Sequence, residues 1–333
     1  MVGIFCEDKR MNVIEPFLRD KTLMVLDGAL GTELERQGYD IKDTLWSAKF
    51  LMENPMAIAK VHEDYLQAGA DCITTASYQA TFDGFMKRGV SLEQAKVLLS
   101  SSVFIARNAV ETFWSEAKNR KGRLKPLVAA SVGPYGAYLA DGSEFRGHYG
   151  LSQEALEDFH RERLGVLIDA QPDLLACETL PCLIEAKALV TLLKAYPKMQ
   201  AWVSFSAKDA KHINSGETMR ECAQWLDKHA QIAAIGVNCT APQYVESLIE
   251  EIRCVSQKPI IVYPNGGATY NALSKTWDAD PKSGTYAKLA YGWYKKGASI
   301  IGGCCQTTPE DIAQIAALAK ETTQGNQYGW ITQ

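Results

Sequence analysis

Three of the nine cysteines stand where they could bind one metal ion together. Cys239 ends an apolar run, and Cys304 and Cys305 follow Gly302 and Gly303 at the end of another. Thiolates are good zinc ligands, and three protein ligands would leave the open position that distinguishes catalytic zinc from structural zinc. Free cysteine is also a common buried residue, so the same side chains could instead belong to the core.

The other six cysteines fit structural positions. The count is odd and the first ten residues lack the apolar core of an export signal. Both observations argue against a disulfide framework and favour the cytoplasm, where thiols stay reduced. We expect Cys6 to lie in a frayed terminus and the remaining five to be core residues: Cys72, Cys177, Cys182, Cys222 and Cys254.

Two carboxylates end other apolar runs. Asp27 precedes a small-residue turn that begins at Gly28, and Glu178 lies near the end of the run from Leu174. The two carboxylates would suit an ammonium group, and a glycine turn lets a ligand approach exposed backbone N–H groups. This combination favours an amino acid as ligand, although a turn after Asp27 is also ordinary at a strand end.

Aromatic residues are frequent in the longer segments between these runs. The face of an aromatic ring attracts a cation, so some of these residues could surround a positively charged ligand. Packing is the alternative role for each of them. The residues are Trp46, Tyr78, Tyr135, Tyr138, Tyr149, Trp277 and Tyr286.

Eight short apolar runs alternate with helix-length segments. Continuous apolar runs are typical of parallel strands that are covered on both faces. Ser91 with Gln94 forms a capping box, and Thr308 followed by Pro309 marks another helix start. The predicted strands are Leu23–Asp27, Asp71–Ser77, Leu127–Val132, Leu174–Thr179, Ala201–Ser206, Ile232–Cys239, Ile260–Tyr263 and Ser299–Gly303.

Eight strand and helix units with no linker between them favour one α/β domain, a single (β/α)8 TIM barrel. We predict that the barrel spans residues 12–325, with terminal extensions at 1–11 and 326–333, and that long loops follow strands 1, 3 and 7. In such barrels the strand ends carry the active site. A doubly wound open sheet is the alternative, but no G-x-G-x-x-G follows any predicted strand.

Composition excludes several classes of protein. The 333 residues are 47% hydrophobic and 22% charged, which are ordinary values for a globular protein. A net charge of −4 does not fit a nucleic-acid-binding surface. No run approaches the roughly 20 apolar residues of a membrane span. We therefore expect neither nucleic acid nor membrane as a partner, while monomer and homodimer both stay open.

In its motifs the chain resembles the homocysteine S-methyltransferases over essentially its whole length. The resemblance rests on Asp27 with its glycine, on Gly236 to Cys239, and on Gly302 to Cys305. A finer similarity is to the cobalamin-independent branch that uses S-methylmethionine. It is carried by Ser131 to Gly147, Leu45 to Lys49, Ala76 to Thr81, Tyr263 to Asn265 and Ser274 to Trp277.

The resemblance implies a zinc enzyme with a barrel fold. One Zn²⁺ would be held by Cys239, Cys304 and Cys305, with the sulfur of L-homocysteine as the fourth ligand. Asp27 and Glu178 would hold the amino group of homocysteine. The substrate thiolate would then be the nucleophile, since the thiolate and not the thiol attacks carbon.

The methyl donor would be S-methylmethionine, with S-adenosylmethionine as a second candidate. Displacement at a sulfonium methyl releases a neutral thioether and therefore needs no proton, so no catalytic acid or base is expected. Gly28 and Asn238 complete the expected substrate site. Trp46 stands where betaine-using relatives place a donor-site tryptophan.

Three other functions remain open at this level. The same fold and zinc site could use betaine or another methyl donor. A barrel aldolase or phosphate-binding lyase would need a Schiff-base lysine or a glycine-rich turn, for which Gly266 and Gly267 are the candidates. A non-catalytic zinc-buffering or redox protein could use the same cysteines.

Overall fold

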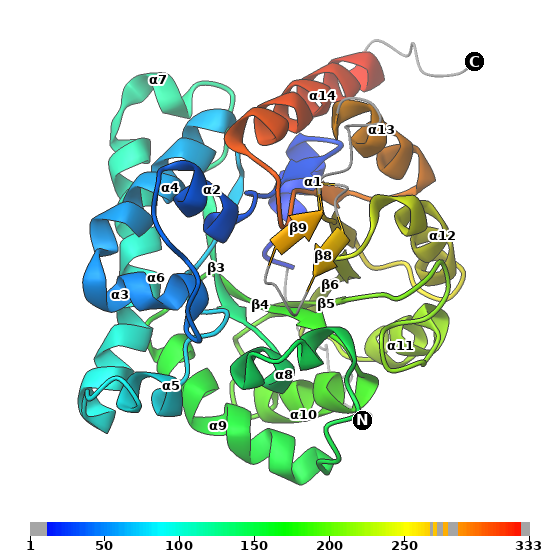
Figure 1. Cartoon of the computed structure of the whole chain (residues 1–333). Coiled ribbons are helices and arrows are strands. Elements are labelled where there is room, and N and C mark those ends of the chain that lie inside the picture. The colour runs from blue at the N-terminus through cyan, green and yellow to red at the C-terminus, as the bar shows by residue number, and fades with distance from the viewer. Residues whose placement is uncertain (1–11, 267–268, 272–275, 279–285, 328–333) are drawn as a thin grey trace, which may run out of the picture.

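The computed structural model describes residues 12–327 except 267–268, 272–275 and 279–285. Eight parallel strands form one sheet surrounded by helices (Figure 1), in the order β1-β10-β7-β6-β5-β4-β3-β2. The strands are β1 (Met24–Val25), β2 (Cys72–Thr74), β3 (Leu127–Val132), β4 (Leu174–Leu180), β5 (Ala201–Phe205), β6 (Ile232–Asn238), β7 (Ile260–Tyr263) and β10 (Ile300–Ile301).

The two edges of this sheet meet and close it into a barrel. Leu26 bridges Cys72 in parallel, next to the ends of β1 and β2. The N–H of Asp27 donates to the carbonyl of Cys72 at 3.0 Å, and the N–H of Asp71 donates to the carbonyl of Val25 at 2.7 Å. The predicted (β/α)8 barrel is therefore confirmed, and the open doubly wound sheet is wrong.

Buried charge fixes the N-terminal end of the barrel. The side chain of Asp71, at the start of β2, is fully buried and accepts from the Val25 N–H at 3.1 Å. Lys21 Nζ donates to the same carboxylate at 2.7 Å. Arg123 lies beside it and donates to the carbonyls of Leu66 and Ala70. These contacts join the strand starts at the end opposite to the predicted site.

Long helices cover the strands, and short ones lie in the loops between them (Figure 1). The helices that cover the barrel are α4 (Pro55–Ala68), α6 (Leu92–Ser115), α9 (Gln153–Asp169), α10 (Leu183–Leu193), α11 (Met219–Leu226), α12 (Pro242–Arg253), α13 (Tyr286–Lys296) and α14 (Pro309–Gln327). The short helices are α1 (Glu15–Asp20), α2 (Leu30–Arg36), η1 (Trp46–Lys49), α3 (Phe50–Glu53), α5 (Phe82–Met86), α7 (Ala117–Arg120), α8 (Tyr135–Leu139) and η2 (Ser143–Phe145).

Both predicted helix starts are confirmed. Ser91 and Gln94 form a complete capping box at the start of α6, each side chain bonding the backbone N–H of the other. Helix α14 begins at Pro309, directly after Thr308. Asp311 accepts hydrogen bonds from the N–H and the hydroxyl of Thr308 at 3.0 and 2.9 Å. Such caps satisfy backbone donors that have no partner within the helix.

Three strands are shorter than predicted by three residues or more, because the backbone leaves the sheet where small residues begin the functional loops, while β5 and β6 each end one residue early. Regular pairing stops at Val25, Thr74 and Ile301. The long loops after strands 1, 3 and 7 are present. The last of them carries an antiparallel hairpin that the sequence did not predict, formed by β8 (Thr269–Asn271) and β9 (Thr276–Asp278).

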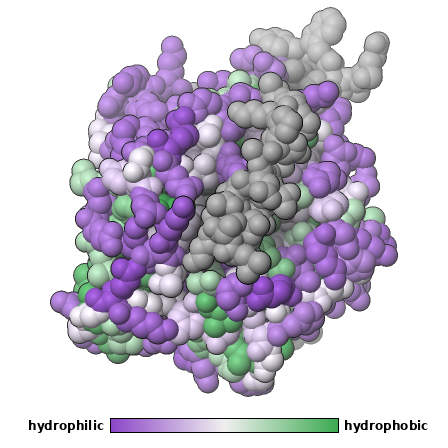
Figure 2. Space-filling view, in the orientation of Figure 1, coloured by the Kyte–Doolittle hydropathy of each residue, from purple (hydrophilic) through white to green (hydrophobic). Residues whose placement is uncertain are grey.

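The buried apolar residues form an inner and an outer cluster. Leu26, Trp202 and Ile261 belong to the cluster inside the barrel, to which α1 contributes Phe17. Their neighbours along the strands, Val25 among them, belong to the larger cluster between strands and helices. This alternation follows from the two-residue period of a strand. Hydrophilic residues cover most of the face seen in Figure 2. In the described ranges no helix is long and apolar enough to cross a membrane.

His62 of α4 should make the fold sensitive to acid. It is fully buried, and neither ring nitrogen has a hydrogen-bond partner in the described part of the chain. Burial lowers the pKa of His62 to about 4, whereas an unfolded histidine has a pKa near 6.5. The unfolded chain therefore binds more protons below pH 6.5, and stability falls as the pH drops towards 4.

At pH 5 this histidine should cost about 2 kcal/mol of unfolding free energy relative to pH 7.5. We expect His62→Leu to lose correspondingly less stability over that interval, as measured by urea unfolding with a chelator present so that metal loss does not contribute. Equal pH dependence of the two proteins would contradict this prediction.

Candidate active site

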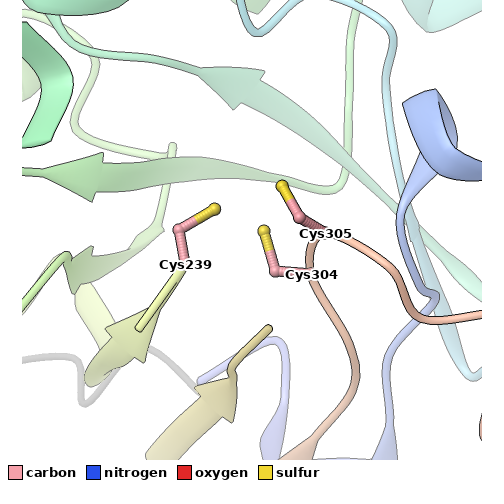
Figure 3. Close-up of side chains that lie close together, drawn as sticks. All are labelled: Cys239, Cys304 and Cys305. Carbon is pink, nitrogen blue, oxygen red and sulfur yellow. The ribbon is translucent and has the colours of Figure 1, made fainter. Parts of the chain in front are cut away.

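The three predicted cysteines converge at one end of the barrel. Their Sγ atoms all lie within 4.8 Å of one another, and Figure 3 shows Cys239, Cys304 and Cys305 directed towards a common space. Cys239 directly follows β6, while Cys304 and Cys305 lie just beyond β10. Strand β7 lies between β6 and β10 in the sheet, so the three cysteines follow strands that are not adjacent.

Unusual backbone geometry brings these thiols together. Cys239 adopts a left-handed conformation, with φ of 46°, which is uncommon for a residue with a side chain. The Cys304 N–H donates to the Pro264 carbonyl at 2.9 Å, and the Gly266 N–H donates to the Cys305 carbonyl at 2.8 Å. The loop after β7 therefore fixes both cysteines of the adjacent pair.

Gly302 and Gly303 are required for close packing and not for backbone freedom. Neither has a positive φ, so the turn does not depend on their backbone freedom. A Cβ on Gly302 would lie 2.5 Å from the Leu26 side chain, and a Cβ on Gly303 would lie 2.2 Å from Thr307 Oγ1. These glycines let the end of β10 approach its neighbours closely.

The thiols also influence one another's ionisation. Hydrogen bonds from the thiols of Cys239 and Cys305 hold the pKa of Cys304 well below its ordinary value. The same contact raises the pKa of Cys239, which acts as a donor to Cys304. The geometry thus favours an anionic sulfur within the cluster.

Asp27 lies just past the end of β1 and is 5% exposed. It accepts hydrogen bonds from the Thr74 N–H at 2.7 Å and from the Thr74 hydroxyl at 3.0 Å. Burial raises the pKa of Asp27 to about 8, although the bonds from Thr74 oppose the rise. A positive charge placed beside this carboxyl would favour its ionised form.

Glu178 is the second buried carboxyl and is 8% exposed. The Ser131 hydroxyl donates to it, and burial raises the pKa of Glu178 to about 7. Its strand β4 shifts register against β5 between Cys177 and Leu180, and the next residue, Thr179, has φ of 56°. This bulge is typical of sites where a strand redirects a side chain.

Asn238 supports that bulge. Its Oδ1 accepts from the Thr179 N–H at 2.7 Å and from the Ser204 hydroxyl at 2.8 Å. Its Nδ2 donates to Thr179 Oγ1 at 2.7 Å. The amide that we predicted to contact substrate is therefore already bonded to β4 and β5, so its evident contribution is to hold the Glu178 segment in place.

One cavity connects these groups. All eight predicted site residues line it: Asp27, Gly28, Trp46, Glu178, Asn238, Cys239, Cys304 and Cys305. Gly28 adjoins the cavity, but a Cβ there would lie 2.8 Å from the Tyr65 ring and hydroxyl. Close packing against Tyr65 therefore requires this glycine, independently of any ligand.

Sequence reasoning missed the polar residues that orient the carboxyls. Tyr263 lines the cavity, and its hydroxyl accepts from Trp202 Nε1 at 2.9 Å and lies 2.6 Å from the Ser204 hydroxyl. Ser131 and Tyr263 both fall in segments that carry the family resemblance, which was the available signal. Inside buried strands, however, such residues resemble ordinary core positions.

The structure divides the predicted aromatic residues. Trp46 and Tyr78 both line the cavity, with ring centroids 6.1 Å apart at 73°. Tyr135, Tyr138 and Tyr149 are not among the residues that line this cavity. Tyr135 packs against the other two and Phe159, which fits the alternative of packing.

Of the last two aromatic residues, Tyr286 is not among those that line the cavity. Tyr286 is buried, and its hydroxyl donates to the carbonyls of Pro264 and Gly302. It therefore supports the loops of β7 and β10. The side chain of Trp277 lies outside the described residues.

The remaining cysteines mostly follow the expectation. Cys72, Cys177, Cys182 and Cys222 are buried. Cys254 is exposed, so its predicted core position is wrong: it caps the C-terminus of α12, past the buried face of that helix. Cys6 lies outside the described residues.

Comparisons with known proteins agree with this fold. A family model described as homocysteine S-methyltransferase matches residues 24–319. Homocysteine S-methyltransferase YbgG of Bacillus subtilis is 55% identical over 310 residues, which cover 93% of this chain and 98% of the relative. The homocysteine S-methyltransferase of Escherichia coli is 47% identical over 307 residues, which cover 92% and 98%.

A solved structure shows the same architecture. The metallated form of the homocysteine methyltransferase MmuM from Escherichia coli matches with a TM-score of 0.83 at 44% identity, covering 92% of this chain and 100% of that chain. The chain belongs to the homocysteine S-methyltransferase family. It is therefore a methyltransferase whose substrates are homocysteine and a methyl donor, which excludes the aldolase, lyase and non-catalytic alternatives.

Removing the charge of Glu178 should weaken homocysteine binding selectively. Glu178→Gln keeps the size of the side chain, and we expect the KM for homocysteine to rise about tenfold to hundredfold, the usual effect of losing a charge-assisted hydrogen bond. Steady-state kinetics with each substrate varied in turn would measure this. The KM for the donor should not change.

Asp173→Asn is the matched control. Its carboxylate accepts from the Val128 N–H at 2.7 Å at the other end of the barrel, so the same loss of charge should leave both KM values unchanged. An unchanged homocysteine KM in Glu178→Gln would remove Glu178 from the amine site.

Proposed function

We propose that this protein is a zinc-dependent enzyme that transfers a methyl group from S-methylmethionine to L-homocysteine and so forms methionine. One observation carries the proposal: three converging thiols and two buried carboxyls line the same cavity. The thiols suit a metal and a substrate sulfur, and the carboxyls suit the ammonium group of an amino acid.

The cysteines fit zinc by the chemistry of their donor atoms. Zinc prefers thiolate and imidazole ligands, and a set of three protein ligands is typical of catalytic sites. Cys239, Cys304 and Cys305 would hold the ion, and the metallated form of the related Escherichia coli enzyme supports a metal here. When bound, zinc keeps a coordinated thiol deprotonated, which is the nucleophilic form.

The buried carboxyls would orient homocysteine. Thr74 fixes the carboxyl of Asp27, and Ser131 fixes that of Glu178, so both carboxyl groups are oriented before homocysteine binds. An ammonium group between them would compensate for the hydration that both carboxyls lose on burial, and would favour their charged forms. The amino acid would then extend with its sulfur towards the cysteines.

The same cavity also suits a positively charged donor. Trp46 and Tyr78 present aromatic rings there, and ring faces attract cations. Among the described residues, the lining contains Glu35, Asp43 and Glu144 besides Asp27 and Glu178, against a single cationic residue, Lys42. Asp43 is paired with Arg88, yet the lining remains acidic in balance.

The transfer needs no proton. The homocysteine thiolate attacks the methyl carbon of the sulfonium, a new S–C bond forms, and the old S–C bond breaks with its electron pair passing to the departing sulfur. Both products are neutral thioethers, so two molecules of methionine result from S-methylmethionine. The chain's task is to align the two sulfurs about one carbon, which can contribute roughly 7–11 kcal/mol to lowering the barrier.

Loss of one thiol should abolish both metal binding and activity. For Cys304→Ala we expect a folded protein that retains almost no zinc and shows no methyl transfer, because two thiols do not make the three-ligand site. Zinc content by mass spectrometry and methionine formation would be measured on the same sample.

The control for this variant is Cys254→Ala. It removes an exposed thiol at the end of α12 and should keep both zinc and activity. One zinc per chain together with normal turnover in Cys304→Ala would refute the metal assignment.

A donor screen tests the other half of the proposal. Zinc-loaded protein with homocysteine would be given S-methylmethionine, S-adenosylmethionine, betaine or methyltetrahydrofolate, and methionine would be quantified. We expect the highest kcat/KM with S-methylmethionine, the donor of the branch that the motifs of this chain resemble, and a lower value with S-adenosylmethionine, which is also a sulfonium. Methyltetrahydrofolate, whose nitrogen would have to be protonated, should give no methionine. A clear preference for betaine would contradict the donor assignment while leaving the methyltransferase intact.

A further inference from the structure

Arg163 is a charged residue buried where neither zinc nor either substrate requires it. Its side chain extends from α9 and is 2% exposed. Nη1 donates to the carbonyl of Gly133 at 2.9 Å, and Nη2 donates to the carbonyls of Ser77 and Tyr78 at 2.8 and 2.7 Å. One guanidinium group thus joins the loop after β2 to the loop after β3.

Neighbouring buried groups complete this arrangement. Burial lowers the pKa of Arg163 to about 10, so the side chain is still cationic near neutral pH, and the nearby Glu185 favours its charge. The carboxyl of Glu185 accepts from the Tyr135 N–H at 2.6 Å and lies 2.9 Å from His160 Nε2. An isolated buried charge is costly, so the fold must keep the positive charge of Arg163 compensated by the negative charge of Glu185.

The segment that Arg163 holds carries a wall of the active-site cavity. Tyr78 lines that cavity with its ring edge-on to Trp46. From behind, Gly133 approaches it so closely that a Cβ would lie 2.4 Å from the Tyr78 carbonyl and 2.7 Å from its ring. The main chain of Tyr78 is therefore fixed by Arg163 and Gly133, while its ring faces the cavity.

We propose that Arg163 is a positioning residue for the methyl donor: by holding the Tyr78 carbonyl it fixes the Tyr78 ring against Trp46 on the donor side of the cavity. The inference rests on the proposed function, because it assumes that these two rings contact the donor. Arg163 itself touches neither substrate, so its effect on the reaction passes through Tyr78.

The test compares Arg163→Lys with the matched variant Arg123→Lys. Arg123 also donates to two main-chain carbonyls, those of Leu66 and Ala70, but at the N-terminal end of the barrel. A lysine keeps the charge but cannot reach three carbonyls in the fork geometry of arginine. Melting temperature, zinc content and both KM values would be measured for each variant with S-methylmethionine as donor.

We expect both variants to melt at lower temperature, but only Arg163→Lys to raise the donor KM, by about tenfold, with zinc content and the homocysteine KM unchanged. Small displacements of positioning groups commonly have effects of this size. A merely structural role would lower the melting temperature and leave the donor KM as it is, and that result would overturn the proposal.

A double-mutant cycle asks whether Arg163 acts through Tyr78. In the Tyr78→Ala background, Arg163→Lys should raise the donor KM by less than twofold, because the ring that it positions is absent. A further tenfold rise in the double variant would show independent effects and would also overturn the proposal. If Arg163→Lys does not fold, Gly133→Ala replaces it, since its added Cβ displaces the same carbonyl.

A readout without substrate separates this inference from the proposed function. Hydrogen exchange of residues 75–81 should become faster in Arg163→Lys and stay unchanged in Arg123→Lys. Failure of the wild-type protein to use S-methylmethionine would refute the donor assignment. Unchanged exchange in residues 75–81 of Arg163→Lys would refute the positioning role, whichever donor the enzyme uses.

Discussion

The architecture of this enzyme depends on bringing three thiols from two non-adjacent strands to one point. Cys239 follows β6, whereas Cys304 and Cys305 follow β10, and β7 runs between them. Only a closed, tightly curved sheet lets such strand ends approach. The glycines at the end of β10 permit this contact because any side chain there would collide with neighbouring residues. The same close approach of strand ends is therefore needed to close the barrel and to bring the metal ligands together.

The two carboxyls of the site are also held in place by neighbouring strands. Burial disfavours the ionised forms of Asp27 and Glu178, yet each already accepts hydrogen bonds from a neighbouring strand. Their orientation is therefore set by the barrel, and a cationic group is what they lack. Because these carboxyls are oriented in advance, they need less reorganisation when the substrate binds than water molecules around the same charge would need.

Reasoning from strand ends predicted the eight-stranded barrel and the meeting of the cysteines with the two carboxyls, whereas Trp46 came from the family resemblance; all eight candidate residues line one cavity. Such reasoning could not find Arg163, because Arg161, an arginine two residues earlier on the same helix, is solvent-exposed. The available signal was spacing, since Arg163 follows Leu156 and His160 on the buried face of α9. The aromatic cluster around Tyr135 depends on tertiary contacts that no local pattern encodes.

Four residues that line the cavity share a left-handed backbone conformation: Ala140, and three with functional side chains, Trp46, Thr179 and Cys239. For residues with a Cβ this conformation costs on the order of 1–2 kcal/mol each. Glycine or asparagine would relieve that cost, but neither supplies an indole, a hydroxyl or a thiol. The rim is thus a place where stability and activity make opposite demands on sequence. Engineering for heat resistance would have to gain its stability elsewhere in the barrel and leave these three positions alone.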